Sequence, residues 1–363
     1  MKRPINSKNA RLLREYAAYL RQADGKSEET ARQIEKAIHR YQTFSGFEDF
    51  ARFDAGRAMR FKAAMTDEDL SKATILSTVN ALRRFFGWLA LQPGFRSKIK
   101  ATDADYLQLA EKDVRAAKAP SDKSFPSLEQ ITAALDAMPA CTVIERRDRA
   151  IVAFTILTGM RDGAIVTLRL KHVDVAQRRV RQDPREVATK ASKWIETFFF
   201  RVGDGIEAIV LDWIEELRAE HLFGPNDPLF PKTKCGHDED RFFVAAGIDC
   251  DFWSNATPMR VIFRRSFEAI GLPAFTPHRF RDTLAHLAYE RCQKPVEFKA
   301  WSQNLGHESP LTTLSSYGKL SPAEQSAIIR RTDGSALSDE KITLAMLHKA
   351  LATLPANVGR DPT

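Results

Sequence analysis

In the first third of the chain the apolar residues recur at helical spacing, and this pattern stops near residue 112. In the stretch SKATILSTVNALRRFFGWLAL, which begins at Ser71, apolar side chains return every three or four residues and share one face of a helix. Ser27 is placed to cap an earlier helix of the same kind. Residues 111–125, EKDVRAAKAPSDKSF, lose the spacing and gather Lys, Ala, Pro and Ser. This composition is typical of an exposed linker, so two domains are expected.

The domain organisation follows from that break. We expect a helical domain at residues 1–114, a linker at 115–125, a second domain at 126–330 and a tail at 331–363. Within the second domain, RRVRQDPREVATKASKWIETFFFRV alternates turn residues with β-branched and aromatic ones, which predicts two or three short antiparallel strands. Helical patterns surround this segment, and ITLAMLHKALATL predicts a helix in the tail. The expected fold class is mainly α with a small antiparallel β-sheet.

The whole of the net charge of +8 lies in the first 125 residues. They contain 24 Lys and Arg against 16 Asp and Glu, whereas the other 238 residues contain 31 of each sign. A basic domain joined to a neutral one favours binding to a polyanion, most often nucleic acid. Lys72, Arg83 and Arg84, on the longest helix, are the candidate DNA-binding side chains of this domain.

Several classes of protein are disfavoured by composition. No apolar run reaches the roughly 18 residues of a membrane span, and the start lacks the apolar core of a signal peptide, so a cytoplasmic protein is expected. The cysteines, Cys141, Cys235, Cys250 and Cys292, lie far apart without a Cys-x-x-Cys pair. A zinc site around Cys235 and Cys250 is the weaker alternative to reduced structural thiols, and no metal is expected.

Three separated patches carry side chains that could bind a phosphate. Arg161 follows Gly159 just beyond a buried helix, where its planar guanidinium could be aimed inward at two oxygens. His278 and Arg281 are three residues apart at a helix start, so they share a face near free backbone N–H groups. Lys190 lies in the predicted turn ATKASKW. Each patch alone is equally typical of an ordinary protein surface.

A fourth patch, NLGHESPLTTLSSY, runs from Asn304 to Tyr317 and contains His307. A tyrosine by itself indicates no chemistry, because a phenol becomes a useful nucleophile only beside groups that bind and activate its target. Tyr289 falls inside a helical pattern, and the remaining tyrosines precede residue 107. Whether Tyr317 is a surface phenol or a nucleophile thus depends on what else the chain supplies.

Taken together, the patches resemble the tyrosine recombinases of the phage integrase superfamily. LTGMR…LRLKHVD is similar to the family's first box, with its catalytic arginine at Arg161. TPHRFRDTLAHL is similar to the His-x-x-Arg box, at His278 and Arg281, and the fourth patch to the third box, with His307 and the nucleophile Tyr317. The resemblance implies a helical SAM-like core-binding domain followed by an α+β catalytic domain.

The same resemblance implies a function. It predicts a site-specific DNA recombinase or integrase that cuts and rejoins strands through a covalent 3′-phosphotyrosine and a Holliday junction, without metal or nucleotide. Arg161 and Arg281 would bind the non-bridging oxygens of the scissile phosphate, and His307 would donate a further hydrogen bond. Two rival functions remain: a type IB topoisomerase that relaxes DNA, and a non-catalytic DNA-binding protein on an integrase scaffold.

Proton transfer has two candidate lysines. Lys190 would protonate the leaving 5′-oxygen, with His278 as acid–base partner, and Lys193 of the same turn is either the alternative acid or a DNA contact. The chain departs from the family where a glutamate commonly follows the first-box arginine by three residues, since it has Ala164. Its interval from histidine to tyrosine is ten residues where nine is common, which leaves open cleavage in cis or in trans.

The implied partner is a double-stranded DNA recombination site. The resemblance predicts a homo-tetramer on DNA, a monomer or weak dimer without it, and an accessory DNA-bending or directionality factor. The tail helix either docks on a neighbouring protomer or packs on its own domain. The length of the chain favours a mobile element, and no membrane partner is expected.

Overall fold

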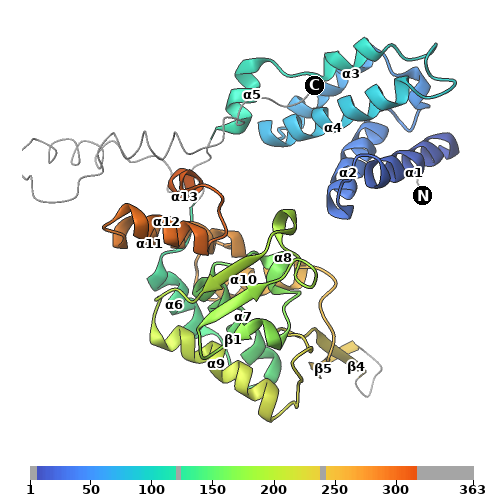
Figure 1. The fold of residues 1–363 in the computed structure, drawn as a ribbon. Coiled ribbons are helices and arrows are strands. Elements are labelled where there is room, and N and C mark those ends of the chain that lie inside the picture. The colour runs from blue at the N-terminus through green and yellow to red at the C-terminus, as the bar shows by residue number, and fades with distance from the viewer. Residues whose placement is uncertain (1–5, 120–123, 238–242, 317–363) are drawn as a thin grey trace, which may run out of the picture. The chain divides into compact units, whose positions relative to one another are not determined.

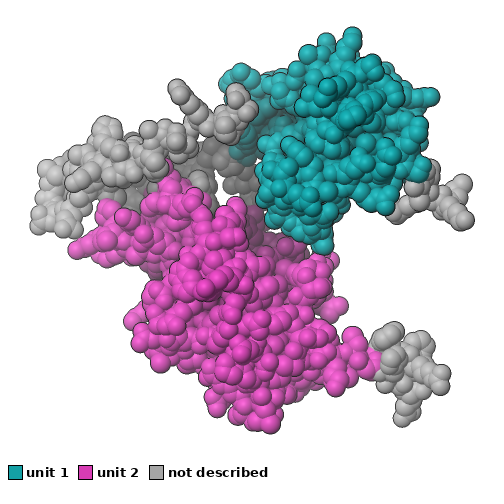
Figure 2. All heavy atoms as spheres, turned by 45° about the vertical axis from the view of Figure 1, so that its right-hand side comes forward, with its two compact units in different colours: residues 1–121 teal, residues 122–363 magenta. Residues whose placement is uncertain are grey.

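The chain forms two compact units, which divide between residues 121 and 122. The structure, a computed structural model, describes residues 6–119, 124–237 and 243–316 (Figure 1). The two units are coloured separately in Figure 2. None of the helices in these described stretches has the length and apolar content that a bilayer span requires.

Two of the sequence-based expectations fall outside the described residues. They are the tail helix predicted within residues 331–363 and the side chain of Tyr317. The last described helix, α13 (Pro310–Ser316), ends at the residue before this tyrosine.

The first unit is helical. Serine side chains cap two of its helices as the sequence suggests: Ser27 Oγ accepts from the Thr30 amide at 3.3 Å, and Ser71 Oγ from the Thr74 amide at 3.2 Å. Its elements are α1 (Ser7–Gln22), α2 (Glu28–Phe44), the 3₁₀ turn η1 (Phe50–Arg52), α3 (Ala55–Asp67), α4 (Lys72–Ala90), the 3₁₀ segment η2 (Ala101–Leu107) and α5 (Glu111–Lys118).

An aromatic cluster forms the core of this unit. The Tyr41 ring of α2 meets Phe53, Phe61 and Phe86 edge-on, with centroid distances of 5.9, 5.3 and 5.2 Å. Phe53 and Phe86 stack with their centroids 3.6 Å apart. Edge-to-face and stacked pairs add about 0.5–1.5 kcal/mol each to the free energy gained by burying their area. The predicted apolar face of α4 is buried.

The first residues of the predicted linker are helical. Residues 115–118 continue α5, although no residue of this helix is buried. Ala, Lys, Arg and Glu have high helix propensity, and Arg115 pairs with Glu111 one turn away at 2.9 Å. Lys72 of α4 also pairs with Asp113 at 2.6 Å. Local propensity and these pairs therefore make a helix where apolar spacing is absent.

The second unit places helices around a small sheet. Strands β1 (Val173–Asp174), β2 (Arg179–Gln182) and β3 (Ile195–Phe198) are antiparallel in the order β1-β2-β3, so β3 is an edge strand. The helices and turns are α6 (Leu128–Ala137), α7 (Val143–Thr158), α8 (Asp162–Ile165), η3 (Leu170–His172), η4 (Lys190–Ser192), α9 (Asp204–Ala219), α10 (Thr257–Glu268), α11 (Pro277–Arg291), α12 (Pro295–Asn304) and α13.

Helix α7 runs through the core of this unit. Ten of its sixteen residues are buried, and it packs against α9, α10 and α11. Thr142 and Glu145 close a capping box at its start, and Gly159 ends it in the left-handed conformation, with φ 61°. A helix buried on nearly all sides holds its end in a defined place, which matters for the arginine that follows.

The predicted fold class, mainly helical with a small antiparallel sheet, is confirmed. The sequence-based analysis missed a second hairpin of strands β4 (Thr233–His237) and β5 (Phe243–Ile248). Polar and glycine residues dilute the alternation of these short strands, and a register shift between Thr233 and Cys235 interrupts it further. Pairing between the two strands, rather than intrinsic propensity, forms this hairpin.

Candidate active site

The end of α7 is pressed against two other segments of the site. A Cβ built on Gly159 would lie 2.6 Å from Leu305 Cδ2 and 2.7 Å from Leu284 Cδ1, and real side chains do not approach so closely. A larger residue here would force these two leucine side chains to move, and the positive φ of Gly159 is a second reason for glycine at this position. The three boxes of the sequence meet at this point.

Arg281 joins these segments through its guanidinium. Its Nη1 donates to the carbonyl oxygen of Gly159, and its Nη2 donates to the Leu305 carbonyl at 2.7 Å and to His307 Nε2 at 2.8 Å. The side chain is buried, and all three acceptors are uncharged. Burial is the main reason that its pKa falls to about 9, and the nearby Arg161 charge adds to this effect. A buried cation whose direct partners are neutral makes a strong anion-binding site.

Both ring nitrogens of His307 are hydrogen-bonded. An arginine can only donate, so Nε2 must accept from Arg281 and the proton of the neutral ring lies on Nδ1. Nδ1 is 2.8 Å from Thr313 Oγ1. Burial, followed by the charges of Arg281 and Arg161, lowers the pKa of His307 to about 4. The imidazole is therefore neutral at pH 7.

Arg161 completes a pair of cations. It stands between α7 and α8, and burial alone lowers its pKa. No hydrogen bond or ion pair joins its guanidinium to another residue of the described stretches. The sequence-based analysis noted that Ala164 replaces a supporting glutamate, and Ala164 is a buried apolar contact. Arg161 thus keeps its donors available to a ligand.

His278 lies in the first turn of α11, next to the free backbone N–H groups of that helix. The N-cap residue Thr276 makes no capping hydrogen bond through its side chain. Desolvation lowers the pKa of His278, Arg281 and Arg161 lower it further, and Asp282 opposes them. Asp282 itself is paired with Arg279 at 2.6 Å. The helix start and its cations favour an oxyanion at this place.

The two candidate lysines differ in their surroundings. Lys190 begins η4, a tight turn in which Ala191 and Ser192 have φ of 59° and 50°, and its charge contributes to lowering the pKa of His307. Lys193 forms an ion pair with Glu308, which follows that histidine in sequence. The charge of Lys190 therefore acts on His307, whereas Lys193 is paired with a carboxylate.

Asn304 joins the edge strand β3 to the segment that contains His307. It was not identified as a site residue from the sequence. Its Oδ1 accepts from the Phe198 amide at 2.6 Å, and its Nδ2 donates to the Phe198 carbonyl at 2.9 Å. One side-chain amide therefore pairs with the free edge of β3 as a neighbouring strand would. A Cβ on Gly306 would lie 3.1 Å from Ile195 Cδ1, so the same strand is in close contact with the loop before His307.

Replacing Asn304 by alanine should free this edge of β3. We expect the Phe198 amide to exchange its hydrogen faster and the free energy of unfolding to fall by about 1–2 kcal/mol, since two hydrogen bonds are lost at a partly exposed site. Hydrogen exchange with mass or NMR detection and urea denaturation would measure both. Gln303→Ala, an exposed position on the same helix, is the matched control. Unchanged exchange at Phe198 in the Asn304 variant would show that the pairing is not formed.

The candidate DNA-binding side chains of the first unit are exposed on α4, and two of them already have acidic partners. Lys72 pairs with Asp113, and Arg83 pairs with Asp105 at 3.1 Å. Arg84 is exposed, and within the described residues no ion pair includes it. A DNA phosphate would have to displace a carboxylate at the first two positions but not at Arg84.

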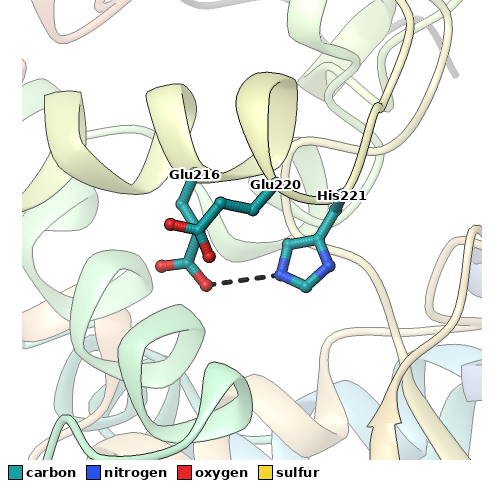
Figure 3. Close-up of side chains that lie close together, drawn as sticks. All are labelled: Glu216, Glu220 and His221. Carbon is teal, nitrogen blue, oxygen red and sulfur yellow. Dashed lines mark hydrogen bonds and ion pairs between the residues drawn. The ribbon is translucent and has the colours of Figure 1, made fainter.

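One group of potential metal ligands occurs in the described part of the chain, and it lies outside this cluster. Glu216, Glu220 and His221, at the end of α9, place their ligand atoms within 4.8 Å of one another (Figure 3). Arg146 of α7 binds both oxygens of Glu216 at 2.7 and 2.8 Å, and His221 Nε2 lies 3.3 Å from the same carboxylate. The group therefore ties α9 to α7.

The cluster suits the binding and stabilisation of an oxyanion. Beyond the effect of burial, the charges of Arg161 and Arg281 lower the pKa values of His278 and His307, Lys190 adds to the effect on His307, and Asp282 is the carboxylate that opposes the shifts of Arg281 and His278. Such a site can hold a phosphate, stabilise added negative charge and transfer a proton.

Comparison with known proteins identifies a family. The model of the phage integrase family matches residues 127–324. The tyrosine recombinase XerD of Vibrio vulnificus is 27% identical over 146 residues, which are 38% of this chain and 45% of that protein. XerC of Escherichia coli O157:H7 is 29% identical over 209 residues, which are 56% and 61% of the two chains. The chain thus spans about half the length of the curated relatives it matches.

Solved structures share the fold at low identity. A lambda integrase dimer bound to a COC′ core site matches with a TM-score of 0.57 and 16% identity, over 94% of this chain and 85% of that one. The XerH recombinase bound to a palindromic difH substrate matches with a TM-score of 0.57 and 14% identity, over 88% and 82%. The Tn1549 transposon integrase with transposon right end DNA matches with a TM-score of 0.56 and 16% identity, over 89% and 99%.

Proposed function

The chain belongs to the phage integrase family, and from this premise we propose that it is a site-specific DNA recombinase. It cuts and rejoins DNA strands through a covalent 3′-phosphotyrosine and a Holliday junction, without metal or nucleotide. The observation that carries this proposal is the buried guanidinium of Arg281, whose direct acceptors are all neutral, beside the guanidinium of Arg161, which is not paired with any of the described residues. A phosphodiester supplies a negatively charged partner for these two guanidinium groups.

The two arginines stabilise the transition state. Attack on a phosphodiester concentrates negative charge on the non-bridging oxygens, so catalysis depends on positioning and on preorganised positive charge. Arg161 and Arg281 bind these oxygens, and His307 donates a further hydrogen bond. Removal of one such donor typically lowers the rate by about 100- to 1000-fold.

Tyr317 is the proposed nucleophile. Its attack transfers the phosphate from the 5′-oxygen of the next nucleotide to the phenol, and the phosphotyrosine keeps the bond energy for religation. Lys190 gives its proton to the leaving 5′-oxygen, and His278 acts as the acid–base partner that accepts the phenolic proton. Lys193, paired with Glu308, remains the alternative acid.

DNA binding is shared between the two units in this proposal. Residues 1–114 form the basic core-binding domain, residues 126–330 the catalytic domain, and four protomers assemble on the recombination site. Phosphate contacts by Arg84 and its neighbours on α4 provide sequence-independent affinity that weakens with salt. We further propose that the tail, residues 331–363, either docks on a neighbouring protomer or packs on its own domain, and that an accessory DNA-bending or directionality factor takes part.

No observation favours either rival function. The curated relatives are named tyrosine recombinases, which supports strand exchange over topoisomerase activity. Burying two arginines without an anion lowers the stability of the fold. A non-catalytic protein would gain nothing in return for this loss.

A covalent-trapping assay tests the proposal. Full-length protein is incubated in EDTA with a nicked suicide DNA that carries the sequences flanking its gene. We expect a protein–DNA adduct that survives detergent, together with binding that weakens as salt is raised. Binding to a confirmed site without any adduct would favour the non-catalytic protein, and relaxation of supercoiled DNA by the monomer without strand exchange would favour the topoisomerase.

A further inference from the structure

Two buried hydroxyl groups stand in a row behind His307. Thr313 Oγ1 lies 2.8 Å from the ring Nδ1, and it donates to Ser302 Oγ at 2.9 Å. Ser302 belongs to α12 and Thr313 to α13, and both residues have no exposed surface. The row therefore links the imidazole to two helices, and its polar atoms are shielded from water.

Only one pattern of protons satisfies every group in the row. Nε2 accepts from Arg281, so the ring proton is on Nδ1. Thr313 must then accept from Nδ1, and its own proton goes to Ser302. A buried hydroxyl without its partner costs about 1–3 kcal/mol, so this pattern is strongly preferred in the free protein.

We propose that Thr313 and Ser302 form a hydroxyl relay that can either accept from or donate to Nδ1 of His307, so that the neutral ring can carry its proton on whichever nitrogen the partner at Nε2 requires. Both are positioning residues, because they act through the histidine and do not touch the DNA. This inference rests on the proposed function for its catalytic consequence, but the protonation pattern itself is a property of the free protein.

The relay is reversible because hydroxyl groups both donate and accept. A phosphate oxygen that takes the place of Arg281 at Nε2 needs a proton on that nitrogen. Nδ1 then becomes an acceptor, Thr313 turns its proton toward it, and Ser302 donates to Thr313 in turn. One ring proton moves from Nδ1 to Nε2 and two hydroxyls rotate, so the histidine becomes a donor without gaining charge. A carboxylate in place of Thr313 could only accept and would keep the proton on Nδ1 unless the ring became cationic.

The surrounding charges favour this neutral route. The pKa of His307 is lowered by burial and by the charges of four residues, which are Arg281 and His278 on α11, Arg161 after α7, and Lys190 in η4. Glu308, the nearest acid in sequence, is occupied by Lys193. An imidazolium is therefore disfavoured, and a change of tautomer is the route by which His307 can donate.

The first experiment measures the ring nitrogens directly. Full-length protein with ¹⁵N-labelled histidine is studied by NMR without DNA, with His307→Gln to assign the signals. We expect Nδ1 to be protonated and Nε2 to be unprotonated, with no change as the pH falls to about 5, because the pKa of His307 is lowered to about 4. In Thr313→Val, Arg281 still donates to Nε2, so the ring proton stays on Nδ1 but loses its acceptor, and the Nδ1 signal should shift, whereas Thr313→Ser should restore the wild-type signal. A protonated Nε2 in the wild type would overturn the proposal.

The second experiment measures adduct formation in a single turnover. Loss of a partner that orients a functional histidine costs about 10- to 100-fold at comparable metal sites, and we expect that decrease in rate for Thr313→Val with DNA affinity unchanged. Ser302→Ala, which keeps Thr313, should have a smaller effect in the same direction and covers the case in which Thr313→Val does not fold. Thr313→Ser should recover most of the rate.

The two experiments separate the two hypotheses. A wild-type protein with the expected ring protonation but no adduct on its confirmed site contradicts the proposed function and leaves the relay standing. A wild-type adduct together with equal rates and unchanged ring signals in Thr313→Val contradicts the relay and leaves the function standing. Equal loss in Thr313→Ser and Thr313→Val also contradicts the relay, because the methyl group rather than the hydroxyl would then matter.

Discussion

Replacing Tyr317 by phenylalanine is expected to abolish the covalent protein–DNA adduct while DNA binding stays within about twofold of the wild type. The change removes one oxygen, the atom proposed to attack the phosphate, and no other group in the site can form the same ester. Gel-shift titration and denaturing gels of the nicked suicide DNA would measure binding and adduct on the same samples.

Tyr289→Phe is the matched control for this prediction. Tyr289 is exposed on α11, carries the same phenol and should form the adduct at the wild-type rate. An adduct that persists in the Tyr317 variant would mean that another residue is the nucleophile. Mixing the Tyr317 variant with an inactive Arg281 variant would further distinguish cleavage in cis from cleavage in trans, because only cleavage in trans restores activity.

Replacing Arg281 by lysine is expected to lower the rate of adduct formation by about 100- to 1000-fold. Lysine keeps the positive charge, but a single ammonium cannot hold the Gly159 and Leu305 carbonyls, His307 Nε2 and a phosphate oxygen in the planar geometry that a guanidinium provides. Single-turnover kinetics on the suicide DNA at saturating protein would measure the chemical step apart from binding.

The same substitution two residues away provides the comparison. Arg279→Lys keeps a cation next to Asp282 on the same helix, and we expect a rate within a fewfold of the wild type. Equal rates for the Arg281 and Arg279 variants would contradict a direct role of the Arg281 guanidinium at the phosphate. A melting temperature near the wild-type value for both variants would confirm that the difference arises in the chemistry.

Much of the helical architecture could be predicted from the sequence, because it depends on local patterns. The buried face of α4, the serine caps of α2 and α4 and the short antiparallel strands all follow from spacing or residue type within about twenty residues. Two elements were not predicted, because their local signals are weak. Residues 115–118 are helical without an apolar face, and the β4–β5 hairpin depends on pairing between strands with weak individual signals.

The residue types of the site were also readable from the sequence, but their partners were not. The sequence by itself determined that the chain contains Arg161, the His-x-x-Arg pair and His307 in the order of one family, since those motifs are contiguous. Only the tertiary structure decided that Arg281 reaches the carbonyl of Gly159, 122 residues away, that Asn304 pairs with the edge of β3, and that two buried hydroxyls stand behind His307. A motif is carried by neighbouring residues, whereas a hydrogen bond between distant segments depends on how helices pack, and packing is decided by the whole core at once.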